Sequence, residues 1–141
     1  MKNKKMDKKM LLSTLWIFVT LNYLYCDIMG LMDVTLLKQY LTGNVGGMAI
    51  TENFLLGAAI FMEIPIIMVL LSRILRNKVN SYANIIAGTI MTLVQTSTLL
   101  VVSPKKYYVF CSTIEIAATT FIVCYAWKWR SPNTLTDELE Q

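Results

Sequence analysis

Four long apolar segments dominate this sequence and restrict what it can fold into. They run over Leu11–Met32, Phe54–Ser72, Tyr82–Ser103 and Tyr107–Trp127, with lengths of 22, 19, 22 and 21 residues. An α-helix needs about 20 residues to cross a hydrocarbon core of about 30 Å. A backbone in lipid must satisfy its own hydrogen bonds, and the segments lack the alternation typical of barrel strands. The predicted fold class is therefore all-α, a four-transmembrane-helix bundle with up-down-up-down order.

The composition excludes several other classes of protein. Of the 141 residues, 55% are hydrophobic and 16% are charged, whereas a soluble domain has roughly 45–50% and roughly 25%. A soluble enzyme or a nucleic-acid binder could not bury this much apolar surface. The chain contains no His, and its three cysteines form no CxxC pair, so neither a metal site nor a cofactor is predicted. Cys26 and Cys111 are expected to be packed thiols, with an exposed redox pair as the alternative.

The distribution of Lys and Arg predicts the orientation of the bundle. The N-terminus, the loop after the second segment and the C-terminal flank together carry ten of these residues, and the opposite side carries three. Since positive charge accumulates in cytoplasmic loops, both termini are predicted to be cytoplasmic. Aromatic residues near the segment ends are expected to lie at the two membrane interfaces: Trp16, Tyr82, Tyr107, Tyr108, Trp127 and Trp129.

The remaining parts of the chain are short and polar. Residues 1–10 form a basic cytoplasmic N-terminus, residues 11–130 the transmembrane domain, and residues 131–141 a polar tail that is expected to be disordered. The one long loop, residues 33–53, is predicted to face outward.

Within that outer loop, Asp33 is a suitable N-cap for a short helix that ends at Leu41. Gly43 would terminate this helix, and Asn44 with Gly46–Gly47 predicts a flexible turn. We expect this loop to lie on the outer interface or to fold over the mouth of the bundle.

Each apolar segment contains one strongly polar residue in its outer half. Glu63, Gln95 and Glu115 are 8 or 9 residues from the outer ends of their segments, which places them about 12–14 Å deep. Asp27 is 5 residues from Met32 and about 7–8 Å deep. These depths are compatible with one polar site shared by all four helices.

The spacing of other residues supports convergence of the helices. Tyr23 shares a helix face with Asp27, and Gly88 and Thr92 belong to a stripe of small residues that lets helices approach closely. Pro65 lies two residues after Glu63 and predicts a kink, because it removes a helical hydrogen bond. An intramembrane acid without a basic partner favours its protonated form.

Five stretches of the chain resemble one bacterial family of small four-helix membrane proteins, classed only as a domain of unknown function. The resemblance covers nearly the whole chain apart from the lysine-rich start and the tail. It implies a multi-pass protein of the bacterial cytoplasmic (inner) membrane, but it supplies no activity and therefore no catalytic residue. The chain is also similar to DoxX-like proteins in size and helix number, which is an analogy only. The five stretches are Leu11–Tyr25, Phe54–Ile60, Met62–Ile66 with Leu70–Arg73, Ala83–Gly88 and Thr113–Ala117.

The leading functional hypothesis is small-ligand binding, or transport coupled to protons or cations, through an outward-facing cavity. Glu63 and Glu115 would accept protons or balance a cation, and Asp27, Gln95 and Tyr23 would complete the polar lining. The expected ligand is small and lipophilic or cationic, the surrounding partner is the lipid bilayer, and nucleic acid is not a partner.

Two other functions remain open. The first is a structural or accessory subunit, whose polar belt only fixes helix packing or docks a partner helix. The second is an enzyme that acts on a membrane lipid, with a carboxylic acid as the proton donor. Transport by so short a chain is expected to require a homodimer, because one copy offers little room for alternating access.

Overall fold

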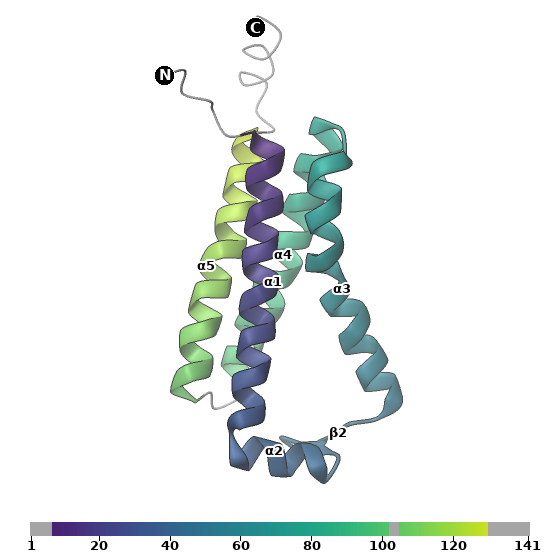
Figure 1. The fold of residues 1–141 in the computed structure, drawn as a ribbon, viewed down its shortest axis with the longest axis vertical. Helices are drawn as coiled ribbons and strands as arrows, with labels where there is room; N and C mark the ends of the chain where they lie inside the picture. Colours follow the sequence, from purple (N-terminus) through teal and green to yellow (C-terminus); the bar gives the residue numbers. More distant parts are fainter. Residues whose placement is uncertain (1–6, 102–104, 130–141) are drawn as a thin grey trace, which may run out of the picture.

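The computed structural model describes residues 7–101 and 105–129, and helices make up nearly all of this part (Figure 1). Four helices are long and apolar enough to cross a membrane. The prediction of an all-α four-helix membrane bundle is therefore confirmed. The predicted tail at 131–141 lies outside the described residues. The elements are α1 (Lys8–Met32), α2 (Val34–Leu41), β1 (Asn44–Val45), β2 (Met48–Ala49), α3 (Glu52–Ile74), α4 (Asn77–Val101) and α5 (Lys106–Trp129).

The spanning helices begin before their apolar segments because polar residues cap them. The Asp7 side chain accepts a hydrogen bond from the backbone N–H of Lys9 at the start of α1. At the start of α3, the Thr51 hydroxyl accepts the backbone N–H of Phe54. These side chains satisfy N–H groups that the first helical turn leaves unpaired. Segments chosen by apolarity alone therefore miss the polar residues at the start of α1 and α3.

Three of the long helices stay together along the bundle, and the fourth diverges. α4 packs most extensively against α5, while α1 packs against both α3 and α5. Figure 1 shows both termini at one end of the bundle, here called the terminal end, and α2 crossing the other, here called the α2 end. Toward the α2 end, α3 leans away from the other helices. Residues 51–60, which include its first two turns, are all exposed.

Proline is the local cause of this divergence. Pro65 lies inside α3 and is buried. Its ring lacks an N–H and clashes with the carbonyl of the preceding turn, which bends a helix. In Figure 1 the half of α3 after the bend stays beside the bundle, and the half before it points outward. The bend thus opens the α2 end of the structure while the terminal end stays closed.

A polar network holds the helices together at the terminal end. Its members, which we call the terminal-end network, are Trp16, Ser72, Asn80 and Asn84, and all are fully buried. Asn84 Oδ1 accepts hydrogen bonds from Trp16 Nε1 at 2.7 Å and from Ser72 Oγ at 3.3 Å. Asn84 Nδ2 donates to Asn80 Oδ1 at 2.6 Å, and Asn80 Nδ2 donates to the Ser72 carbonyl at 2.6 Å. The network joins α1, α3 and α4.

Trp16 therefore corrects one expectation from the sequence. It was expected in an aromatic belt at the interface, but its side chain is completely buried and its indole N–H bonds to Asn84. The indole fills the core at the level of the network, where its polar edge has a partner. Distance from a segment end does not distinguish an inward-facing aromatic residue from one that faces the interface.

Close contact between α4 and α5 depends on a small residue. A Cβ atom added at Gly88 would lie 2.7 Å from Val123 Cγ2 and 3.4 Å from the Thr119 carbonyl oxygen. One turn further along α4, Thr92 Oγ1 bonds to Thr119 Oγ1 at 2.8 Å. Small residues with interhelical hydroxyl bonds are typical of helix packing in membranes.

The long loop forms an ordered cap at the α2 end. Asp33 caps α2 by accepting the backbone N–H of Thr35 and of Leu36, as the sequence predicts. The turn predicted at Gly46–Gly47 joins the two strands of a short hairpin, in which β1 pairs with β2. Gly46 and Gly47 have φ values of 58° and 86°, which match the two central positions of a type I′ turn.

Candidate functional site

Three of the five predicted site residues meet between α1 and α5, and the other two do not join them. Tyr23 and Asp27 come from α1, and Glu115 comes from α5. Electrostatic interactions link Glu115 to both of them. We call these three residues the acid cluster. Gln95 lies beside it on α4, whereas Glu63 lies apart from it as an exposed residue of α3. The sequence therefore predicted the three members of the cluster, and it also predicted two residues, Gln95 and Glu63, that lie outside it.

Glu115 is the most deeply enclosed member of the cluster. Its side chain is completely buried, and neither carboxylate oxygen has a hydrogen-bond partner among the described residues. It lies nine residues from the start of α5, or about 13–14 Å along the helix. The buried face of α5 also carries Cys111, Ser112 and Thr119, spaced at three and four residues as one face of a helix requires. Buried acids normally have a partner, so this one is unusual.

Tyr23 and Asp27 approach Glu115 from α1 with different exposure. The Tyr23 side chain is 6% exposed, and its hydroxyl also has no hydrogen-bond partner within the described parts of the chain. Asp27, one turn further along α1, is exposed. An accessible acid thus stands next to a buried acid and a buried hydroxyl. The Asp27 carboxylate is therefore accessible from outside the protein, whereas the Glu115 carboxylate lies in its interior.

Two thiols lie next to the acid cluster. Cys26 and Cys111 are both buried and free, and they lie next to each other. This matches the expectation of packed thiols rather than of an exposed pair. Their contact fixes α1 against α5 immediately beside Glu115.

Gln95 has a structural partner instead of an acidic one. Its side chain is 9% exposed, and Nε2 donates to Ser112 Oγ at 2.7 Å. Ser112 precedes Glu115 by three residues on the same face of α5. Gln95 therefore positions the helix that carries Glu115 and occupies one side of that helix's polar face.

The short helix α2 covers the cluster at the α2 end. Tyr40 of α2 interacts electrostatically with Asp27, and partial burial, followed by the Asp27 carboxylate, raises the pKa of its phenol. Lys105, just before α5, forms an ion pair with Asp33 at the junction of α1 and α2. The sequence identified this helix and its cap, but a contact across 72 residues leaves no local signal.

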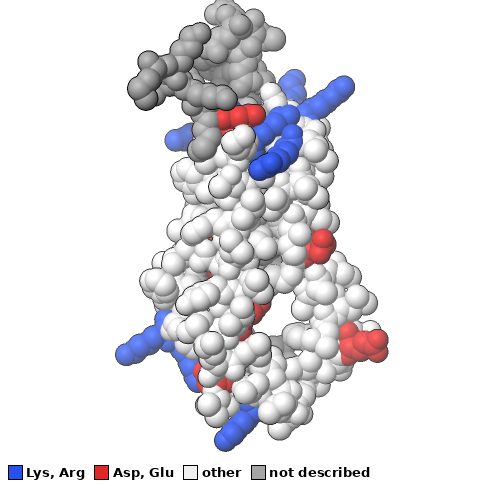
Figure 2. Space-filling view, in the orientation of Figure 1, with Lys and Arg blue, Asp and Glu red and all other residues white. Residues whose placement is uncertain are grey.

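The surface of the protein has an opening beside the bundle, toward the α2 end. Figure 2 shows blue atoms only near the two ends of the molecule and a middle that is white apart from a few red acidic atoms, as expected for a membrane-spanning surface. Between the outward half of α3 and the rest of the molecule, the same view shows an opening with acidic atoms at its edge. Across 7–101 and 105–129, no group of three or more Cys, Asp and Glu side chains could hold a metal ion.

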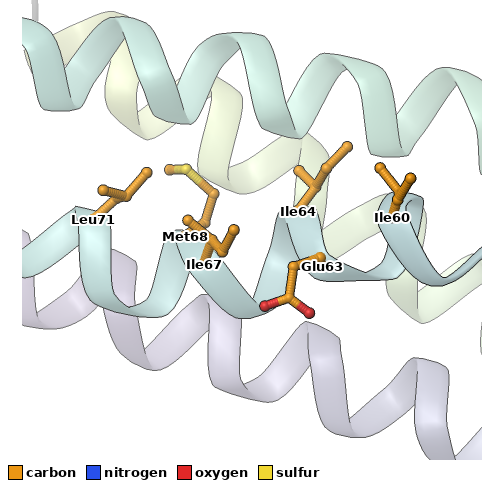
Figure 3. Close-up of a pocket in the computed structure, with 6 residues that line it drawn as sticks. All are labelled: Ile60, Glu63, Ile64, Ile67, Met68 and Leu71. Carbon is orange, nitrogen blue, oxygen red and sulfur yellow. The ribbon is translucent and has the colours of Figure 1, made fainter.

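Glu63 lies apart from the cluster, at the middle of α3. It is eleven residues from either end of this helix, which is about 16–17 Å. The side chain is exposed, and the described residues provide it with neither a hydrogen bond nor an ion pair. It belongs to the lining of a groove on α3 (Figure 3).

Comparison with known proteins identifies a family but no activity. The family described as "Family of unknown function (DUF6326)" matches residues 1–136. No curated protein and no solved structure matches the chain.

Proposed function

Because the chain belongs to the DUF6326 family, whose function is unknown, we propose a function from its own residues. The protein is a multi-pass membrane protein that takes up and releases a proton at Glu115, and it couples this exchange to the binding or transport of a small ligand. Asp27 is the entry point for the proton, and Tyr23 is a polar neighbour that the proton or the ligand can contact.

The observation that carries this proposal is that no residue in the described part of the chain donates a hydrogen bond to the buried Glu115 carboxylate. A fully buried carboxylate without a partner is costly in its ionised form and is neutralised by a proton or a cation. Intramembrane acids of this kind mark ion and proton pathways. The exposed carboxylate of Asp27 beside it supplies a route by which the proton can be exchanged.

The alternative, an accessory subunit whose polar residues only fix helix packing, is less well supported. Packing is served by the terminal-end network and by the contact of Gly88 and Thr92 with α5, in which the polar groups are bonded. Glu115 and the Tyr23 hydroxyl make no such bond in the described structure. A residue kept only for packing would be expected to have a partner.

The proposal also includes the orientation of the protein in the membrane and its oligomeric state. The charge asymmetry of the loops favours cytoplasmic termini, which would make the α2 end the outer side, in a bacterial cytoplasmic membrane. The acid cluster would then open outward beneath α2. Transport would require a homodimer, because the four helices of one copy leave little room for a second, inward-open state.

Proton flux into liposomes tests this proposal. Purified protein is reconstituted with an internal pH dye, the potential is clamped with potassium and valinomycin, and an external acid pulse is applied. The wild type should carry protons faster than empty liposomes. Glu115→Gln should reduce this excess at least tenfold, and Asp27→Asn should slow it. Glu52→Gln, on the exposed end of α3, is the matched control and should behave like the wild type.

Two results would contradict the proposal. If the wild type carries no more protons than empty liposomes, or if Glu115→Gln is as active as the wild type, the acid cluster does not exchange protons across the membrane. An accessory role would then be the better explanation.

A further inference from the structure

Glu63 occupies an unusual position for an ionisable group. It lies at the midpoint of α3, the helix with the highest mean hydropathy of the four, 2.5. In a bilayer this is the hydrocarbon centre, where a charged side chain is least stable and normally faces a partner or a cavity. The nearest cationic residue on the same helix, Arg73, is ten residues away, or about 15 Å. No ion pair joins Glu63 to another described residue, so either a proton or a cation from outside the chain must neutralise it.

The surroundings of Glu63 define the shape of such a cation. A groove of about 410 Å³ runs along α3, and apart from Glu63 its lining is entirely apolar. This volume is within the range of roughly 300–1,000 Å³ that is typical of small-molecule sites. In Figure 3 the Glu63 carboxylate points toward α1, whereas several of the apolar side chains extend toward α4. The lining residues are Ile60, Glu63, Ile64, Ile67, Met68 and Leu71.

The groove is reachable from the bilayer. The outward half of α3 has exposed apolar side chains, with Phe54 47%, Leu56 59% and Ile60 64% exposed. The bend in α3, the helix that contains Pro65, separates this half from the other helices. A molecule dissolved in the lipid can therefore reach the groove without crossing a polar surface.

We propose that the groove on α3 binds a single-chain lipophilic amine, with its ammonium group on Glu63 and its alkyl chain along Ile60, Ile64 and Met68. The carboxylate supplies charge complementarity at one point, and the aliphatic lining supplies the rest of the contact. A second copy of the chain is a poorer occupant. A twofold axis along the membrane normal would place the two Glu63 carboxylates at the same depth, facing each other. Like charges at that position repel.

This site is independent of the proton site at Glu115. The two carboxylates belong to different helices, and no interaction between them is seen in the described residues. Failure of the amine site at Glu63 would therefore leave the proton site at Glu115 untouched, and substitutions at the two positions have separate effects.

Binding of radiolabelled decylamine to the full-length protein in phosphatidylcholine nanodiscs tests the proposal, with empty nanodiscs subtracted. The wild type should bind one decylamine per chain saturably, and neutral decanol should bind at least tenfold more weakly. Glu63→Gln should weaken decylamine binding at least tenfold. Glu52→Gln, the matched control on the same helix outside the groove, and Glu115→Gln should stay within twofold of the wild type. Ile64→Trp, which fills the groove and keeps the carboxylate, should also abolish binding.

Several results would overturn the proposal. Equal binding of decanol and decylamine would mean that the groove binds an alkyl chain but does not recognise the ammonium group. Unchanged binding by Glu63→Gln or by Ile64→Trp would place the amine elsewhere. Wild-type binding no greater than that of empty nanodiscs would exclude the site. A loss of dimer mass in Glu63→Gln, without any effect on amine binding, would show that a second copy covers the carboxylate.

Discussion

The substitution Asn84→Ala removes the side chain on which the terminal-end network converges. Asn84 accepts hydrogen bonds from Trp16 and Ser72, and it donates both to the carbonyl and to the side chain of Asn80. The alanine would leave the indole N–H of Trp16 buried without an acceptor. It would also leave a gap between α1, α3 and α4, because the site is completely closed.

The size of the effect follows from these four hydrogen bonds. Two of them, from Trp16 and from Ser72, run between helices, where such bonds are worth on average about 0.6 kcal/mol each, so their loss contributes about 1 kcal/mol. Leaving the buried Trp16 N–H unpaired can raise the penalty further, since an unsatisfied buried donor costs about 1–3 kcal/mol. These terms overlap, because the Trp16 bond is one of the four. We therefore expect Asn84→Ala to lower the free energy of unfolding by about 2–4 kcal/mol.

Reversible unfolding in mixed detergent micelles, followed by tryptophan fluorescence and helical circular dichroism, measures this difference. Asn22→Ala is the matched control, because Asn22 bonds only to the Phe18 carbonyl of its own helix and is not part of the core. The control should change the unfolding free energy by no more than about 0.5 kcal/mol. If Asn84→Ala is as stable as Asn22→Ala, the terminal-end network does not hold the bundle together.

Three further substitutions test other parts of the fold. Gly88→Ala should lower the unfolding free energy by about 1–3 kcal/mol, measured in the same assay, because its Cβ would meet Val123 Cγ2 at 2.7 Å. The bond from Lys105, followed by backbone N–H groups, lowers the pKa of Asp33 below its ordinary value. Its stabilising effect is therefore fully present above about pH 5 and is lost as the pH falls through the lowered pKa. Melting curves of the wild type and Asp33→Asn should differ at neutral pH and converge in acid. Pro65→Ala should straighten α3, and spin labels on the outward half of α3 and on α1 should then move closer together.

The bundle itself could be predicted from the sequence because the signal is local. Apolar segments of about 20 residues admit few folds in lipid, and Asp33 followed by the apolar face of α2 is a local capping pattern. The buried face of α5, which carries Ser112 and Glu115, also follows from helical spacing. These inferences require only residues that are close together in the chain.

The arrangement of the polar groups could not be predicted in the same way. Compatible depths suggested one site for Asp27, Glu63, Gln95 and Glu115, but depth does not fix the direction in which a helix face points. Glu63 lies on α3, two residues before Pro65 and apart from the acid cluster, so the structure has two carboxylate sites. The bond between Trp16 and Asn84 joins residues 68 positions apart, and nothing near either residue indicates it.

Infrared difference spectroscopy of the protein in lipid tests the central claim most directly, because it observes the carboxyl group at Glu115. Between acid and alkaline buffer, the wild type should show a protonated carboxyl band that Glu115→Gln lacks and that Glu52→Gln retains. The band should shift in heavy water, and it should do so more slowly in Asp27→Asn. If the spectra of the wild type and Glu115→Gln coincide, Glu115 does not exchange a proton and the proposed function is wrong.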